Sequence, residues 1–206
     1  MGEDAYVDLY WLPLGAGGHC VRWNGRVYEA VIAGWQHRSR CDLYHCALQV
    51  RAEATTYAIE MGPVWNVTAA DRGVVCEGPV GSRALGRFAA FRYEVRCWPA
   101  GRIPDLDEAV GEPQRVTTDA QQARAVMRAV ALVPALTWGR DERGLGEMWN
   151  SNSVVSWALA TAGQDASAIR LPQNGRAPGW LAGLRLAATP ATPSGPAPPS
   201  APAGGA

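Results

Sequence analysis

Several features that mark common classes of protein are missing from this sequence of 206 residues. Lys+Arg and Asp+Glu each number 19, so the formal net charge is zero. Surfaces that bind nucleic acid or anionic membranes need an excess of positive charge, and we therefore expect no nucleic-acid partner. No apolar stretch approaches the roughly 18 residues of a membrane-spanning helix, so we expect no membrane span. The N-terminal residues lack a basic segment followed by an apolar run, so we also expect no signal peptide.

The cysteine pattern indicates thiols rather than zinc ligands or a redox pair. The number of cysteines, 5, is odd, and none of them has the paired spacing of zinc or redox motifs. The 3 histidines do not join cysteines or carboxylates at metal-ligand spacing, so we expect no metal and no cofactor. Reduced, mostly buried thiols are typical of cytoplasmic proteins, and we predict that location.

The first half of the chain has the apolar pattern of β-strands. Asn24-Gly25 is the strongest short signal for a hairpin, because both turn residues tolerate positive φ. The alternation of apolar and polar residues is clearest in the last predicted strand. The predicted strands cover residues 6–12, 20–23, 26–31, 43–50, 57–61 and 91–98.

The second half has the period of helices. Thr118 as N-cap and Gln121 three residues later have the form of a capping box, and Pro134 ends the helix that follows. A second helix is predicted over residues 152–162, with Gly163 at its C′ position. Strands first and helices after are typical of an α+β domain.

Composition divides the chain into one domain and a tail. From residue 189 to residue 206 the chain contains only Ala, Pro, Thr, Ser and Gly. Such a segment cannot bury apolar side chains, and we expect it to be disordered. We therefore predict a single domain over residues 1–187 and a disordered tail over residues 188–206.

The most informative stretch is the polar cluster Trp149-Asn150-Ser151-Asn152-Ser153 at the start of the second helix. Asn and Ser are the best N-cap residues, because their short side chains accept hydrogen bonds from free N–H groups, so an ordinary cap is one interpretation. One cap needs one residue, however. The further hydroxyls lie in the positive end of the helix dipole, which favours an alkoxide and an oxyanion site. The cluster therefore indicates either a nucleophile or a well-capped helix.

Two residues upstream could complete a catalytic site. His45 lies at the start of a predicted strand and could act as a general base, with a buried histidine bonded to a carbonyl as the alternative. Glu60 lies on the next strand and could orient His45, as the third member of a triad does. It could equally form a salt bridge with a nearby arginine, since a buried carboxylate needs a partner.

The order of these parts resembles the circularly permuted branch of the papain-like superfamily. A histidine at the start of a strand-turn-strand unit comes first, and a helix opened by an Asn-nucleophile pair comes far downstream. That branch includes permuted relatives of the NlpC-type peptidases, the lecithin-retinol acyltransferase-like proteins and the PPPDE group, with a motif close to Asn-Cys-Asn-x-Phe. Residues 150–154 are similar to it, with Ser151 in the cysteine position, as in an Asn-Ser-Asn-Thr-Phe version of bacterial proteins.

This resemblance implies a small antiparallel sheet packed on helices, with His45 facing Ser151 across a cleft. It also implies a hydrolase or acyltransferase that acts on an amide or ester. Ser151 would be the nucleophile, Ser153 its alternative, and the N–H groups of Asn152 and Ser153 would hold the oxyanion beside Asn150. A serine hydroxyl needs a stronger base than a thiol does, so a second function stays open. In that function the domain is catalytically inactive and binds a peptide or an acyl group.

For either function we expect a small molecule or a peptide as the ligand. The chain has 9 tryptophans but 2 phenylalanines, and tryptophan favours the rims of pockets as well as packing under loops. Arginines in glycine-rich loops could contact an anionic part of the ligand. The predicted binding residues are Trp149, Trp180, Arg140 and Arg176.

Overall fold

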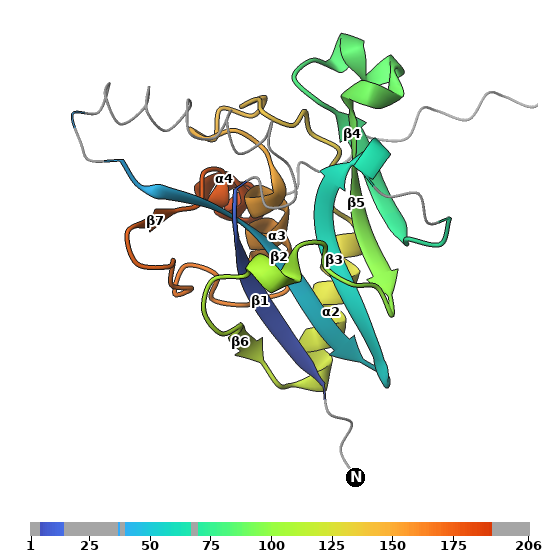
Figure 1. Cartoon of the computed structure of the whole chain (residues 1–206), viewed down its shortest axis with the longest axis vertical. Coiled ribbons are helices and arrows are strands. Elements are labelled where there is room, and N and C mark those ends of the chain that lie inside the picture. The colour runs from blue at the N-terminus through green and yellow to red at the C-terminus, as the bar shows by residue number, and fades with distance from the viewer. Residues whose placement is uncertain (1–4, 15–36, 38–39, 67–69, 191–206) are drawn as a thin grey trace, which may run out of the picture.

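The structure is a computed structural model, and it describes residues 5–14, 37, 40–66 and 70–190 (Figure 1). In this part of the chain most of the strands come first and the helices follow. The strands are β1 Tyr6–Pro13, β2 Asp42–Ala52, β3 Thr55–Pro63, β4 Val74–Pro79, β5 Arg92–Pro99, β6 Gln114–Thr117 and β7 Gly175–Arg176. The helices are α2 Ala120–Ala131, α3 Ser151–Thr161 and α4 Trp180–Ala188, and short 3-10 turns are η1 Val64–Asn66, η2 Arg83–Arg87, η3 Ala89–Phe91 and η4 Leu106–Glu108.

The strands form one sheet with the helices on one of its faces. The strand order is β4-β5-β3-β2-β1-β6 with antiparallel neighbours, and β7 pairs in parallel with the start of β2. Figure 1 shows α2, α3 and α4 behind the sheet and η4 in front of it. The prediction of an α+β fold with an antiparallel sheet packed on helices is confirmed. None of the helices within the described ranges has the length and apolar character needed to cross a membrane.

The alternation of side chains along β2 creates two apolar layers. Tyr44, Cys46, Leu48 and Val50 belong to the large core between sheet and helices. Ala47 points to the other face. The helices fill the large core with buried residues at helical spacing, which are Ala123, Val126 and Val130 of α2 and Val154, Val155, Ala158 and Leu159 of α3. The second, smaller layer consists of Leu12, Ala47, Ala58 and Ile103.

Four predicted strands are confirmed with small changes of boundary, namely those at β1, β2, β3 and β5. The predicted hairpin around Asn24-Gly25 lies outside the described residues. The strands β4 and β6 were not predicted from the sequence. Both are short, and both lie at an edge of the sheet, where only one neighbour constrains their pattern.

The two predicted helices are also confirmed, with one correction at the start of α2. The N-cap is Asp119 rather than Thr118, and the Asp119 side chain accepts a hydrogen bond from Gln122 N at 2.8 Å. Helix α2 ends at Ala131, before Pro134. Helix α3 ends at Thr161, and Gly163 follows with a φ of 80° as expected for a C′ glycine.

A third helix, which was not predicted from the sequence, begins at Trp180. Trp180 is the first residue of α4, and Gly179 before it has a φ of 88°. Helix α4 packs along α3, with Gly183 at the point of close approach. Because glycine lowers helix propensity, Gly183 in the middle of the segment concealed this helix.

The sheet divides where β2 and β3 separate (Figure 1). The pairing of β2 with β3 ends at Leu48↔Ile59, whereas β2 stays paired with β1 as far as Tyr44↔Pro13. The segment between α2 and α3 bridges the two parts. Trp138 forms isolated bridges with Val80, which follows β4, and with Trp149, which precedes α3. The start of α3 therefore lies between the separated strands.

Candidate functional site

The start of α3 is attached to the strand that carries His45. Leu43 O accepts a hydrogen bond from Leu14 N beyond β1, so the carbonyl of Tyr44 points to the side from which β3 has departed. Asn152 Nδ2 donates to that carbonyl at 2.9 Å and to Pro178 O, also at 2.9 Å. The asparagine side chain therefore takes the place of a strand partner, and it brings Ser151 and His45 to adjacent segments.

Two residues of the polar cluster have structural roles. Asn150 Oδ1 accepts from Asn152 N at 2.9 Å and from Ser153 N at 3.3 Å, and Asn150 Nδ2 donates to Pro178 O at 2.8 Å. Ser153 Oγ accepts from Asn150 N at 3.1 Å and donates to Gly179 O at 2.8 Å. The two N–H groups predicted to hold an oxyanion are thus engaged in the cap, as is the hydroxyl of Ser153.

Three polar groups at the same place have no partner among the described residues. They are the side-chain oxygen of Asn152, which is buried, the hydroxyl of Ser151, and the backbone N–H of Ser151, which as the first N–H of α3 has no partner within the helix. Ser151 is 7% exposed and Asn152 is 2% exposed. A buried polar group without a hydrogen bond costs free energy, and most native structures avoid it. At the start of α3, the Ser151 hydroxyl and N–H are therefore free, and Asn152 Oδ1 is a buried acceptor without a partner.

His45 is half-buried and makes no hydrogen bond with any residue of the described part. Burial lowers the pKa of His45 to about 4, so the imidazole is neutral at pH 7 and can accept a proton. Its neighbours Tyr44 and Cys46 point into the helix-side core, whereas its register partner Leu12 belongs to the smaller layer on the other face. The His45 side chain therefore points to the face opposite α3, which corrects the expectation that it faces Ser151 across a cleft. No hydrogen bond joins His45 to Ser151 or to Ser153 in the described structure.

The low pKa of His45 predicts a pH dependence of stability. Below pH 6.5 the unfolded chain takes up a proton at this residue, whereas the folded chain does so only near pH 4. The contribution of neutral His45 to the free energy of unfolding is therefore complete above pH 6.5 and is lost as the pH falls toward 4. Over this range we expect the free energy of unfolding of wild type to fall by about 2 kcal/mol more than that of His45→Gln, after allowance for the partial exposure of the ring.

Urea unfolding at pH 7 and pH 4.5 measures this difference. His37→Gln, which alters an exposed histidine, is the matched control and should follow wild type. Equal pH dependence of wild type and His45→Gln would contradict the assignment of a buried neutral imidazole.

Glu60 forms the predicted salt bridge instead of orienting His45. Arg96 Nη1 donates to Glu60 Oε1 at 2.8 Å, and Arg96 Nε donates to Glu94 Oε2 at 3.0 Å. Arg72 also binds Glu94, with Nε at 2.7 Å. Burial raises the pKa of Glu60 against the effect of Arg96. Burial alone would raise the pKa of Glu94 too, but the two arginines outweigh it and lower this pKa.

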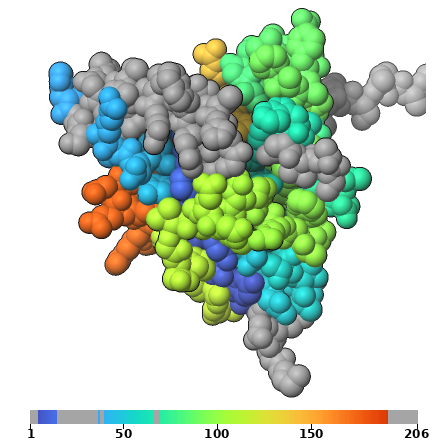
Figure 2. Space-filling model, viewed as in Figure 1, coloured from blue at the N-terminus to red at the C-terminus, as the bar shows by residue number. Residues whose placement is uncertain are grey.

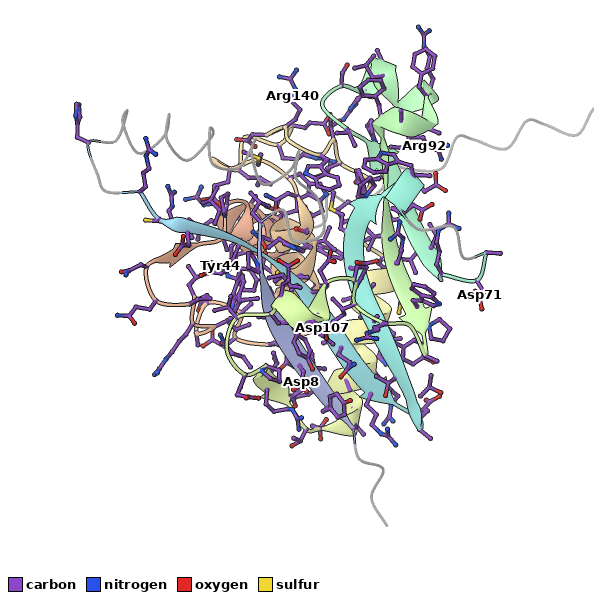
Figure 3. All side chains as sticks on the ribbon, viewed as in Figure 1. Asp8, Tyr44, Asp71, Arg92, Asp107 and Arg140 are labelled. Atoms are coloured by element: carbon purple, nitrogen blue, oxygen red, sulfur yellow. The ribbon has the colours of Figure 1, made fainter. Side chains whose placement is uncertain are left out.

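The four predicted binding residues do not gather around Ser151 as a rim. Trp149 is 2% exposed and belongs to the core, which corrects its predicted place at a rim. Trp180 packs on Trp11 with ring centroids 5.4 Å apart, and its Nε1 donates to Ala166 O. Arg140 (Figure 3) is exposed and donates to Gly81 O, while Arg176 lies in β7.

The sequence did not point to the backbone groups that complete the site. The carbonyls of Tyr44, Pro178 and Gly179 accept from the polar cluster, and a backbone carbonyl leaves no mark in the residue pattern. The pair Pro178-Gly179 was an available signal, because it marks a turn directly before a helix. Across the described ranges, no group of three or more His, Cys, Asp and Glu side chains could hold a metal ion.

The arrangement can bind a small polar group and present a hydroxyl to it. The Ser151 hydroxyl and N–H lie at the positive end of α3, where a developing negative charge is stabilised. His45, on the strand attached to this helix start, carries a neutral imidazole on the other face of the sheet. Comparisons of the chain with family models, with curated proteins and with solved structures give no match.

Proposed function

We propose that the chain is a hydrolase or acyltransferase that acts on an ester or amide through Ser151. The observation that supports this proposal is the state of the polar groups at the start of α3. Asn150 and Ser153 are fully used in the cap, whereas the Ser151 hydroxyl and N–H are unpaired in a nearly buried place. A hydroxyl and an adjacent N–H left unpaired at a helix N-terminus are the groups that acyl transfer needs.

In the proposed reaction Ser151 Oγ attacks the carbonyl carbon of the substrate. For His45 to accept the hydroxyl proton, its imidazole must move from the opposite face of β2 to within about 3 Å of Oγ when substrate is bound. The Ser151 N–H and the dipole of α3 stabilise the oxyanion of the tetrahedral intermediate. His45 then returns the proton to the leaving group, and water or another nucleophile releases the acyl group from Ser151.

The resemblance to the permuted papain-like superfamily and the cytoplasmic location belong to the same proposal. Asn150-Ser151-Asn152 begins the helix as that family's motif implies, and β2 and β3 form the strand-turn-strand unit that carries the histidine. Cys46, Cys76 and Cys97 are thiols in the structure, as expected for a reducing compartment.

A second candidate function is binding without chemistry. Two observations favour it: Glu60 is held by Arg96, and the pKa of His45 is near 4. A base of that pKa is weaker at pH 7 than one tuned to neutrality, and no carboxylate orients it in the described structure. The unpaired groups of Ser151 and Asn152 would then hold a peptide or acyl group without cleaving it.

Labelling with a fluorophosphonate separates the two functions. An activated serine displaces fluoride and retains the phosphonyl group, which intact mass spectrometry detects as one adduct per chain. We expect wild type to be labelled and Ser151→Ala to remain unlabelled while it unfolds at a temperature close to that of wild type.

The matched control is Ser167→Ala, which removes an exposed serine and should be labelled like wild type. Absence of labelling in wild type would overturn the catalytic proposal. Equal labelling of wild type and Ser151→Ala would overturn the choice of nucleophile.

A further inference from the structure

The two phenylalanines of the chain are both on its surface. Phe88 is 49% exposed and Phe91 is 42% exposed, and Trp65 is 66% exposed. Leu85, at 38%, adds a fourth apolar side chain. These residues lie on the turns η1, η2 and η3 or between them, and η3 contacts both η1 and η2. We call these four side chains the aromatic patch.

The aromatic patch belongs to a projection of the molecule. Figure 2 shows the segment of η2 and η3, in green, standing out from the body at the top of the view. Exposed tryptophan and phenylalanine side chains are costly in water, and a cluster of them is typical of a binding surface. Unlike the aromatic patch, Ser151 of α3 lies among buried residues.

The charges around the aromatic patch are largely neutralised. Arg83 Nε is 2.7 Å from Glu142 Oε1, and Arg92 is paired with Glu77. Arg87 stacks over the ring of Phe88, with 4.8 Å from its Cζ to the centroid. A surface of aromatic rings without excess positive charge suits an uncharged apolar ligand better than a nucleic acid or an anionic membrane.

The chain itself contains a segment of that chemistry. Residues 189–206 have no charged side chain and include six prolines, namely Pro190, Pro193, Pro196, Pro198, Pro199 and Pro202. Proline-rich segments favour the polyproline II conformation, and exposed aromatic side chains are the surfaces that recognise it. Residues 191–206 lie outside the described part of the chain.

The end of α4 places this segment within reach of the aromatic patch. Arg185 of α4 donates to Leu145 O, and Leu145 N donates to Asp141. Glu142 of the same loop binds Arg83 of η2, next to the patch. These contacts join α4 to η2 through a single loop, and the 16 residues after Pro190 would span up to about 50 Å as polyproline II.

We propose that the aromatic patch of Trp65, Leu85, Phe88 and Phe91 binds the proline-rich segment of residues 191–206 of the same chain. Trp65 and Phe88 stack against proline rings, and the absence of charge in the segment matches the neutralised surroundings of the patch. Because the segment is tethered, its effective concentration at the patch is in the millimolar range, so even a weak contact is occupied.

The test uses the full chain and a fluorescein-labelled peptide with the sequence of residues 189–206, followed by fluorescence anisotropy. In wild type the tethered segment competes with the peptide. Replacing Pro193, Pro196, Pro198, Pro199 and Pro202 by alanine removes that competitor. We expect the peptide to bind this variant at least about tenfold more tightly than wild type.

Phe88→Ser in the alanine-substituted chain should weaken peptide binding at least about tenfold, because it removes a stacking side chain. Leu132→Ser is the matched control, since Leu132 is 74% exposed on another helix end and lies outside the patch. The proposal is overturned if the alanine-substituted chain shows no saturable binding, or if Phe88→Ser binds as the control does. Thermal unfolding of each variant checks that it is folded.

Discussion

Arg96→Met is expected to lower the free energy of unfolding by about 3–5 kcal/mol, because it leaves the buried Glu60 without its guanidinium partner and Glu94 with Arg72 alone. The Arg96 side chain is fully buried, Glu94 is 1% exposed and Glu60 is 12% exposed. Arg96 also donates from Nη2 to Pro63 O at 2.9 Å, at the end of β3. The substitution therefore breaks one backbone contact in addition to two ion pairs.

The size of this effect is measured by urea unfolding at pH 7 with linear extrapolation. Combining Arg96→Met with Glu60→Gln and Glu94→Gln should recover much of the loss, because the buried charges are then gone. Arg102→Met is the matched control. Arg102 and Asp107 are 77% and 89% exposed, and an exposed pair contributes about 0–1 kcal/mol. A loss below about 1 kcal/mol for Arg96→Met would refute the importance of the network.

Gly183→Ala is expected to destabilise the protein by about 2–3 kcal/mol although alanine favours helices. A Cβ at residue 183 would lie far inside contact distance of Ser156 Oγ and Ser153 O. The second of these atoms belongs to the backbone of α3, so α4 would have to move away from α3. That movement would also strain the hydrogen bond of Ser156 Oγ to Trp180 O, which is 2.8 Å long.

Thermal and urea unfolding measure this prediction, and a second variant identifies its cause. Ser156→Ala removes the side-chain atom of the clash and leaves the carbonyl of Ser153 in place. The double variant Gly183→Ala/Ser156→Ala should therefore be no more stable than Gly183→Ala alone. A stability of Gly183→Ala within about 0.5 kcal/mol of wild type would show that the two helices can separate without cost.

The sequence predicted those elements whose own pattern decides their structure. The strands β1, β2, β3 and β5 alternate clearly, and α2 and α3 have capping residues at their starts. Helix α4 was missed because it contains Gly183, a residue of low helix propensity. This glycine is needed where α4 packs closely against α3. The strand that contains Glu94 and Arg96 was predicted, but the burial of these two side chains was not. Their burial depends on segments that are distant in the sequence and cover that face of the strand.

The position of the candidate site was predicted from the sequence, but not which of its residues form the cap and which hydroxyl remains free. The polar residues at the start of α3 predicted both a cap and a reactive hydroxyl, and the structure contains the cap at Asn150 and Ser153. Which hydroxyl stays unpaired depends on the carbonyls of Pro178 and Gly179, whose positions follow from the close packing of α4. Pairwise contacts of this kind cannot be obtained from spacing along the chain.

The bridge at Trp138 turns one end of the open sheet into a closed ring. The path runs from β2 through β3 and β5 to Val80, across Trp138 to Trp149, and returns through Asn152 to Tyr44. The side-chain hydrogen bond of Asn152 to Tyr44 O closes the ring, so the start of α3 is one of its links. Loss of this one bond would open the ring and free the end of β2 from the helix, so the Asn152 amide couples the two parts of the divided sheet.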